Sequence, residues 1–337
     1  MTVLQPPPDR DLDLVCVGNA IVDVLAHADD GFLERHGMAK GAMHLIDTEA
    51  ALRIYADMPP GIEASGGSAA NTAAGVAALG GRVHFVGRVA DDELGRVFAH
   101  DIRAVGVDFD TPAVTGHLAA AGTARCLILV SPDAQRTMNT YLGVSARLDI
   151  DDVETVDLST AKAVYCEGYL YDEPVAKDAI RHAMEQARRA GTAVSLTLSD
   201  SFCVDRHRAE FLELVEERVD ILFANEAEIC SLYEVATFEE AAERVAGRVG
   251  IACLTRSEKG SLVISDDGQR LEVSAAPAEL VDSTGAGDLY AAGFLARWAA
   301  GASLEECGRV ASLAAAEVLS SLGPRPQTDL RKLVGLD

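Results

Sequence analysis

Three small residues, Gly285, Ala286 and Gly287, stand directly before Asp288 and open an apolar stretch with helical spacing. Small residues let the oxygens of an anion approach the backbone, and the start of a helix offers them free N–H groups. The pattern predicts a pocket for a phosphate or for a transition-state oxyanion. The carboxylate at its mouth would either take the proton of an attacking hydroxyl during phosphoryl transfer or merely complement the helix dipole.

Other phosphate and nucleophile motifs do not fit this chain. Tyr290 stands where a dinucleotide fingerprint needs its third glycine, and no GK[ST] follows the turn. An NAD-dependent dehydrogenase is therefore disfavoured. No GxSxG elbow occurs, which also disfavours a serine hydrolase.

A second glycine pair, Gly66-Gly67, precedes an alanine-rich helix expected at 69–79. Such a pair permits close approach of a ligand to the backbone. Asn71, one turn into the helix, offers both a donor and an acceptor, which suits sugar hydroxyls. The alternative is a helix with a serine cap and a buried asparagine that bonds only the backbone.

Two further polar segments follow expected strands. Asp23 comes just after a strand at 14–17, at the edge where open α/β sheets bind ligands, and its carboxylate can accept bonds from two hydroxyls. Asn225 and Glu228 follow a strand at 221–224. They would hold Mg²⁺ through water, or they would only begin a solvated helix.

The elements that must position these residues alternate between strand and helix, which predicts an α/β fold with a doubly wound, mostly parallel sheet flanked by helices. Expected strands lie at 14–17, 83–86, 163–166, 193–198, 221–224, 252–255 and 261–265, and expected helices at 69–79, 94–105, 173–190, 238–248, 287–300 and 303–320.

Two stretches, 27–48 and 109–147, break this alternation with short segments such as 124–130 and 135–141. We interpret them as a small β lid inserted in the main domain, with ordinary surface hairpins as the alternative. The domain itself is expected at 12–330. Residues 1–11 are expected to form a disordered leader, because Pro6 to Pro8 block regular pairing.

Composition limits the functions open to the chain. With 29 basic and 53 acidic residues its net charge is −24, which argues against nucleic acid or an anionic membrane as a partner. Seven cysteines without a CxxC pair are typical of a reduced protein, and the N-terminus does not resemble a signal peptide, so we expect a cytoplasmic location.

Together, these segments resemble the ribokinase-like (PfkB) carbohydrate kinase family. SGGSAANTAAGVAALGGRVHFVGRVADDELG is similar to its N-terminal signature and DSTGAGDLYAAGFL to its C-terminal one. The order GNxxxD, GG…N, NxxE, TxxxxG and DSTGAGD follows the family from about residue 13 to 325.

The resemblance implies a role for each segment. Asp288 would be the catalytic base, beside an anion hole for the γ-phosphoryl group of ATP formed by Gly285, Ala286 and Gly287. The substrate would be held by Asn19, Asp23, Gly67, Ser68 and Asn71. ATP would contact Asn225, Thr255, Gly260, Ala311 and Ala315, with Mg²⁺ handled through water by Glu228. Activation by a monovalent cation such as K⁺ is left open, as is the choice between monomer and homodimer.

Several stretches resemble the adenosine kinase branch of the family, namely GNAIVDVLA, GMAKGAMHLID, QRTMNTYLG and YCEGYLYD. Arg136 matches the lid arginine of that branch, although a solvated hairpin charge is the alternative. Met43 stands where the branch often carries a polar residue facing the nucleobase. Apolar lid residues, among them Met43 and Tyr141, would wall a base pocket.

The resemblance therefore implies transfer of the γ-phosphate of ATP to a nucleoside, with the 5′-hydroxyl of adenosine as first choice. A ribose- or fructose-like sugar is the second choice. A ligand sensor without activity is a further alternative, although Asp288 and the glycines of the anion hole are all present.

Overall fold

The computed structural model describes residues 4–133, 135–321 and 323–336. Its larger sheet has eight strands in the order β13-β12-β11-β10-β9-β8-β1-β5. All pairs are parallel except β11 with β12 and β12 with β13. The strands are β1 Leu12–Val17, β5 Val83–Val86, β8 Ala161–Glu167, β9 Ala193–Thr197, β10 Ile221–Asn225, β11 Ile251–Thr255, β12 Ser261–Ser265 and β13 Arg270–Val273.

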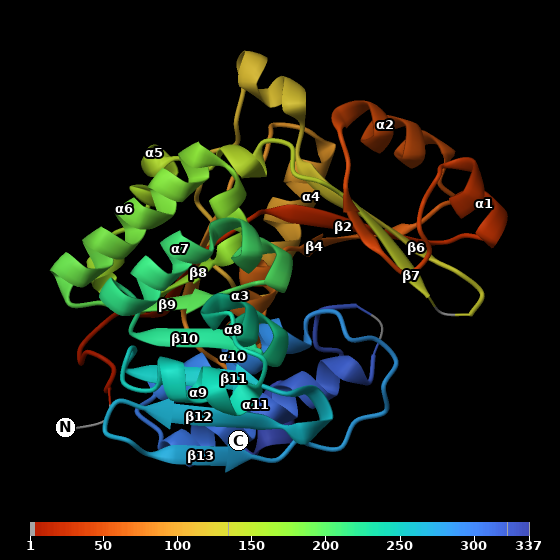
Figure 1. Ribbon diagram of the computed structural model, residues 1–337. Helices are drawn as coiled ribbons and strands as arrows, with labels where there is room; N and C mark the ends of the chain where they lie inside the picture. The colour runs from red at the N-terminus through yellow and green to blue at the C-terminus, as the bar shows by residue number, and fades with distance from the viewer. Residues whose placement is uncertain (1–3, 134, 322, 337) are drawn as a thin grey trace.

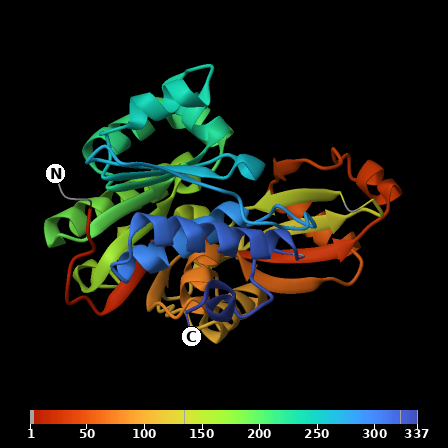
Figure 2. The same cartoon turned by 90° about the horizontal axis from the view of Figure 1, so that it is seen from below.

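Helices cover both faces of this sheet (Figures 1 and 2). One face packs against α3, α10 and α11, and the other against α6, α7, α8 and α9. In β1, Cys16 joins the first hydrophobic core while Val15 and Val17 join the second, because neighbouring side chains of a strand point to opposite faces. This explains why the central strands are uninterrupted apolar runs.

The longer helices are α2 Thr48–Asp57, α3 Ser68–Ala78, α4 Glu93–Ala104, α6 Pro174–Ala190, α7 Ser201–Glu217, α10 Ala286–Ala299 and α11 Leu304–Leu319. The shorter ones are α1 Asp30–Arg35, α5 Ile150–Val153, α8 Glu226–Tyr233, α9 Phe238–Val245 and α12 Leu330–Val334. Over the described ranges, no helix combines the length and the apolar character needed to cross a membrane.

A second sheet of five strands, in the order β3-β7-β6-β2-β4, projects from one side of the molecule in both views (Figures 1 and 2). Its strands are β2 Ile21–His27, β3 Met43–Leu45, β4 Ile62–Gly66, β6 Ala124–Val130 and β7 Arg136–Tyr141. Most of β2 and all of β4 thus lie outside the two ranges expected to form the lid. We refer to these five strands as the small sheet.

The regular elements agree closely with the sequence prediction. The strands predicted at 83–86, 261–265 and 124–130 are confirmed at both ends, and the other predicted strands and helices differ from the observed ones by up to three residues at an end. Several elements were not predicted, among them β13 and the helices α1, α2, α5, α7 and α12, and α1 lies within the range 27–48 that we interpreted as strands. Helix α7 is the longest of these. Its apolar spacing is interrupted at His207, where φ is −121° and the helix is kinked.

The described part of the leader contacts the body of the protein. The Leu4 carbonyl accepts a 3.0 Å hydrogen bond from Trp298 Nε1, and Arg10 Nη2 donates one of 2.8 Å to the Ala190 carbonyl. The first three residues of the predicted leader lie outside the described residues. The described part of this segment, which we expected to be disordered because of its prolines, is therefore bonded to α10 and α6.

Candidate active site

Asp288 is held in the first turn of α10 by two side chains of α3. Its Oδ1 accepts a hydrogen bond of 2.7 Å from the Ser68 hydroxyl, and its Oδ2 accepts one of 2.9 Å from Asn71 Nδ2. Burial raises the pKa of Asp288 to about 6, although these two bonds and the charge of Arg325 act to lower it. The carboxylate is therefore mostly ionised at neutral pH and able to accept a proton.

The turn before Asp288 leaves backbone donors free. Gly285 is the N-cap of α10 with φ of 79°, in the left-handed region that favours glycine. The Ala286 N–H makes only a long bond, of 3.4 Å, to the Ser283 carbonyl. Among the described residues, the N–H groups of Gly287 and Asp288 have no acceptor. An anionic oxygen can therefore bind at this helix start.

Asp23 lies within β2, in the small sheet, rather than in a loop after β1. The sequence led us to expect a loop because the apolar run of β1 is followed by Gly18, but only three residues separate β1 from β2. The Asp23 carboxylate lies against Gly66, where a Cβ would come within 2.3 Å of Asp23 Oδ2. Gly66 therefore makes room for this carboxylate.

The electrostatics of Asp23 connect it with the rest of the site. Burial raises the pKa of Asp23 to about 7. The charges of Arg325 and Arg136 lower this pKa, whereas those of Asp288 and Asp282 raise it. Two carboxylates and two guanidinium groups thus interact with Asp23 across the space between the small sheet and α10.

Asn19 is engaged by the protein itself. Its backbone N–H and its Nδ2 donate to Glu167 Oε1 at 2.9 and 2.7 Å, and its Oδ1 accepts a 3.0 Å bond from the Ser145 hydroxyl. Glu167 Oε2 accepts a further bond, of 2.8 Å, from the Ala69 N–H. Glu167, which we did not predict, therefore ties the junction of β1 and β2 to α3 and holds the Asn19 side chain in place.

Gly67 serves a contact within the chain, whereas Asn71 keeps an acceptor free. Gly67 has φ of 97°, and a Cβ there would lie 2.2 Å from the Asn19 carbonyl oxygen, so its small size serves the contact with the chain. Asn71 Oδ1, in contrast, is buried and has no hydrogen-bond partner among the described residues. It is an acceptor beside Asp288 that a substrate hydroxyl can satisfy.

Arg136 joins the small sheet to the turn before α10. Its Nη1 lies 2.5 Å from Asp282 Oδ2 and donates a 3.1 Å bond to the Thr284 hydroxyl. Asp282 Oδ1 also accepts bonds from the N–H and hydroxyl of Thr284, at 3.1 and 2.9 Å. Arg136 Nη2 is buried without a partner among the described residues. The small sheet therefore reaches the turn and brings a spare donor to it.

Asn225 and Glu228 form a capping box at the start of α8. Asn225 Oδ1 accepts from the Glu228 N–H at 2.9 Å, while the Glu228 carboxylate accepts from the Asn225 N–H at 3.0 Å and from its Nδ2 at 2.5 Å. Burial, together with the charges of Asp200 and Asp288, raises the pKa of Glu228 to about 7. A cation between these carboxylates would relieve their repulsion.

In the described part of the chain, no three His, Cys, Asp or Glu side chains are grouped to ligate a metal. Mg²⁺ bound with a nucleotide takes most of its ligands from phosphate and water. Glu228, already bonded by Asn225, therefore fits contact with Mg²⁺ through water.

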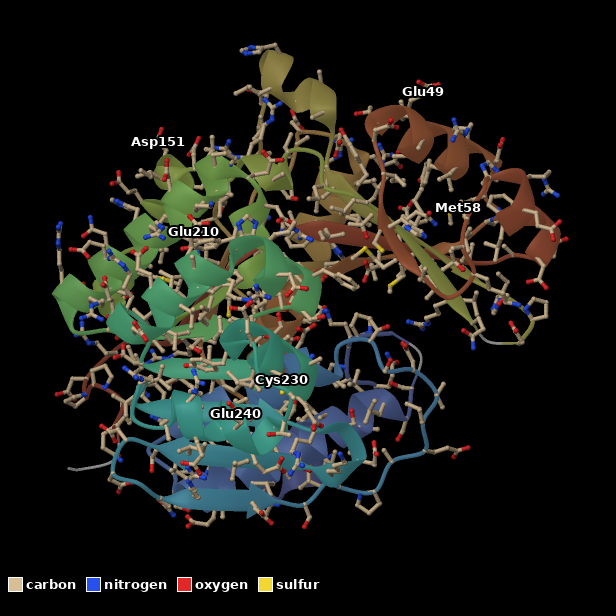
Figure 3. The ribbon with its side chains drawn as sticks, in the orientation of Figure 1. Glu49, Met58, Asp151, Glu210, Cys230 and Glu240 are labelled. Carbon is tan, nitrogen blue, oxygen red and sulfur yellow. The ribbon has the colours of Figure 1, made fainter. Side chains whose placement is uncertain are left out.

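A cavity of about 750 Å³ adjoins the capping box, and its lining includes Asn225, Thr255, Arg256 and Lys259. It lies on the side of α8 and α9, on which Cys230 and Glu240 are labelled in Figure 3. The structure thus brings together two of the five residues predicted to contact ATP.

The other three predicted ATP contacts lie apart from this cavity. Gly260, with φ of 83°, lies against the Val273 carbonyl, so its small size serves the contact with the end of β13. Ala311 is fully buried and packs against Gly293 of α10. Ala315 is partly buried on the same helix, α11, which also borders a second cavity of about 440 Å³ beside β13.

The small sheet presents an apolar surface on the same face as Asp23. Residues paired across a sheet share a face, and Asp23 pairs with Cys126, which in turn pairs with Thr140. The neighbouring row holds Ile128, Met138 and Met43, and Leu45 pairs with Thr140. Met43 and Leu45 are 44% and 57% exposed.

Tyr141 lies on the opposite face of the small sheet. It pairs with Arg125, whose guanidinium stacks over its ring at 5.6 Å. Its hydroxyl donates to the Ala121 carbonyl at 2.6 Å and accepts from the Thr48 hydroxyl at 3.0 Å. The structure therefore does not bring Tyr141 to the surface that carries Met43 and Asp23.

Arg325, which we also did not predict, lies at the centre of this charge cluster. Its Nη2 donates to the carbonyl and hydroxyl of Ser65 at 3.1 and 3.2 Å. Burial lowers the pKa of Arg325 to about 10, against the attraction of Asp23, Asp288 and Asp101. Prolines on both sides of Arg325 interrupt any helical or strand pattern, so no local signal points to it.

Known structures resemble this chain along most of its length. The structure titled adenosine kinase from Sinorhizobium meliloti is 50% identical, covers 96% of this chain and 99% of its own, and has a TM-score of 0.88. The structure of a probable sugar kinase from Rhizobium etli CFN 42 is 48% identical, covers 97% and 100% of the two chains, and has a TM-score of 0.89.

Among curated proteins, 5-dehydro-2-deoxygluconokinase of Geobacillus thermodenitrificans (strain NG80-2) is 26% identical over 76% of this chain and 78% of its own length. The family described as pfkB family carbohydrate kinase matches residues 63–330, which include Asn71, Asn225 and Asp288. This chain belongs to the pfkB family of carbohydrate kinases.

Proposed function

We propose that this kinase transfers the γ-phosphate of ATP to the 5′-hydroxyl of adenosine. Asp288 takes the hydroxyl proton, the acceptor oxygen bonds to the γ-phosphorus, and the bond to the β,γ-bridging oxygen breaks, releasing ADP. The support for this base is its ionised state near neutrality and its fixed orientation between Ser68 and Asn71.

The transferring phosphoryl group binds at the turn formed by Gly285, Ala286 and Gly287, where free N–H groups stabilise the charge on its oxygens. Arg136 adds its spare Nη2 donor from the small sheet. Asn71 Oδ1 accepts a bond from a ribose hydroxyl, and Asp23 accepts bonds from others.

ATP follows from the family, and Mg²⁺ typically accompanies it. In our proposal the nucleotide extends from the anion hole toward Asn225 and Thr255, which share a cavity. Glu228 contacts Mg²⁺ through water, and the metal supplies charge neutralisation on the phosphates. Stimulation by K⁺ belongs to the same proposal.

The observation that favours adenosine over a free sugar as the substrate is the apolar surface beside Asp23. Met43 and Leu45 are exposed there, next to Met138 and Cys126. A nucleobase buries such a surface, whereas a free sugar presents hydroxyl groups in every direction. The 50% identity with the adenosine kinase of Sinorhizobium meliloti supports the same choice.

A sugar is the second candidate, because a probable sugar kinase of Rhizobium etli is 48% identical. An assay of ADP release distinguishes the two candidates. MgATP is supplied with one acceptor at a time: adenosine, inosine, guanosine, ribose, fructose or 5-dehydro-2-deoxygluconate. The same series is run in K⁺ and in tetramethylammonium buffer.

We expect the highest kcat/KM with adenosine. A preference for a free sugar would refute the nucleoside proposal and leave Asp288 as base. The absence of acceptor-dependent turnover with every compound would favour a ligand sensor without activity. Met43→Ser tests the apolar surface directly: it should raise KM for adenosine and leave kcat nearly unchanged, because the base interacts with that surface equally in ground and transition states.

A further inference from the structure

The segment Gly323-Pro324-Arg325 lies directly on the turn that begins α10. The Gly323 N–H donates a 2.9 Å bond to Asp282 Oδ2, the same oxygen that pairs with Arg136. Pro324 lies against Gly285, where a Cβ would come within 2.7 Å of Pro324 Cβ. Two successive contacts therefore fix the backbone from which the Arg325 side chain extends.

From this backbone Arg325 reaches across to the end of β4. One nitrogen, Nη2, bonds the carbonyl and hydroxyl of Ser65. Ser65 precedes Gly66, which contacts the Asp23 carboxylate, and it is three residues before Ser68, which bonds Asp288. Arg325 is thus bonded to the segment between β4 and α3, and the same segment supplies the Ser68 hydroxyl that bonds Asp288.

The other two nitrogens of Arg325, Nε and Nη1, are buried and have no hydrogen-bond partner among the described residues. Buried polar groups are nearly always hydrogen-bonded, and a charged group without partners is costly. No carboxylate of the described residues forms an ion pair with Arg325 within 4.0 Å. These two nitrogens are therefore free to donate hydrogen bonds to an anionic ligand.

We propose that Arg325 is a catalytic residue that binds the oxygens of the transferring phosphoryl group and of the phosphate monoester product. This rests on the proposed phosphotransferase function. The charges of Asp288 and Asp23 act on Arg325, so the guanidinium is close to the base that receives the acceptor proton. Arg136 and Arg325, the former from β7 and the latter from the C-terminal segment, then contact the phosphoryl group from two directions.

Arg325 takes no part in the exchange of bonds. The acceptor O–H proton passes to Asp288, the new P–O bond forms, and the electron pair of the broken bond leaves with ADP. Arg325 donates hydrogen bonds to phosphoryl oxygens throughout, and more strongly as their charge shifts toward the acceptor. The alternative is that Arg325 only holds β4 in place through Ser65.

Arg325→Gln separates these roles, with Arg189→Gln as the matched control because Arg189 makes an exposed ion pair with Glu185 on α6. If Arg325 binds phosphoryl oxygens, kcat falls by about 10²-fold, the scale of one lost transition-state donor. Inhibition by AMP, the product with adenosine, weakens about tenfold. Adenosine binding by calorimetry without ATP stays within about threefold of the wild type.

Arg325→Lys retains the charge and guards against a variant that fails to fold. It should give kcat values between those of the wild type and Arg325→Gln. Addition of guanidinium to Arg325→Ala should restore part of the activity, which a lost strand anchor would not permit. Wild-type kcat and AMP inhibition in the folded Gln variant would overturn the proposal. Equal losses in adenosine and AMP binding would also overturn it, in favour of the anchoring role.

Failure of the adenosine proposal would look different. The wild-type enzyme would then turn over another acceptor, and the same variants would be assayed with that acceptor and its phosphate monoester. A fall in kcat and product affinity with that pair would support Arg325 whichever acceptor is used.

Discussion

Replacing Ser68 with alanine removes one of the two side-chain hydrogen bonds that stabilise the ionised form of Asp288. Ser68 Oγ donates to Asp288 Oδ1 at 2.7 Å and has no second side-chain acceptor in the described part of the chain. The pKa of Asp288 is about 6 with this bond in place. Because the bond lowers that pKa, its loss must raise the pKa and move the acidic limb of the pH–rate profile upward.

The size of the change follows from the strength of the bond. A hydrogen bond to a charged group contributes about 1.5–3 kcal/mol, and water recovers part of it, so we expect the midpoint to rise by about one pH unit. At pH 6 the ionised fraction of Asp288 then falls from about one half to about one tenth, a roughly fivefold loss of kcat/KM, with less than about twofold loss at pH 8.

The assay is ADP release at low acceptor concentration and saturating MgATP, from pH 5 to 9. Ser265→Ala is the matched control, because it removes a 2.6 Å bond between a serine and Asp267 at the far hairpin of β12 and β13. An unshifted limb, or a loss of equal size at every pH, would refute the role of Asp288 as the base that titrates in this range.

Four other variants test the remaining parts of the site. Asp288→Asn should lower kcat by about 10²-fold or more with little change in acceptor binding, and wild-type turnover would contradict the assignment. Arg136→Gln should lower kcat and increase ADP release without acceptor, because loss of the link to the turn admits water. Gly285→Ala, at a φ of 79°, should destabilise the fold by about 1–3 kcal/mol in urea titrations, and unchanged stability would remove the argument from backbone strain. Glu228→Gln should raise the Mg²⁺ concentration for half-maximal activity, and an unchanged Mg²⁺ titration would exclude Glu228 from metal handling.

Local sequence patterns identified those parts of the site that are made locally. The small residues before Asp288 predicted a helix start with free donors, and Asn71 followed from its place one turn into α3. Asn225 and Glu228 were found from their place after an expected strand, and they pair with each other within one helical turn. The bond between Asn71 and Asp288, in contrast, joins residues 217 positions apart and was not predicted from local spacing.

Contacts between distant segments left no such pattern. Arg325 and Ser65 are 260 positions apart, and no local rule pairs them. Glu167 likewise bonds Asn19 across 148 positions. Tyr141 was assigned to the substrate surface from its aromatic type, but the alternation of side chains along β7 turns it to the opposite face. Prediction of these three needed the sheet register, which the sequence alone does not provide.

A chain with net charge −24 must here bind a polyanion next to carboxylates, which would repel it. Burial holds the pKa of both Asp23 and Glu228 at about 7, so a share of each is protonated at neutrality and repulsion is reduced. A bound phosphate would raise these values further and would also threaten the ionised state of Asp288. The guanidinium groups of Arg136 and Arg325 oppose that effect, since each favours the ionised carboxylates near it. In our proposal both arginines bind the phosphoryl oxygens, and Arg325, whose charge lowers the pKa of Asp288, also keeps the base able to accept a proton while that group is present.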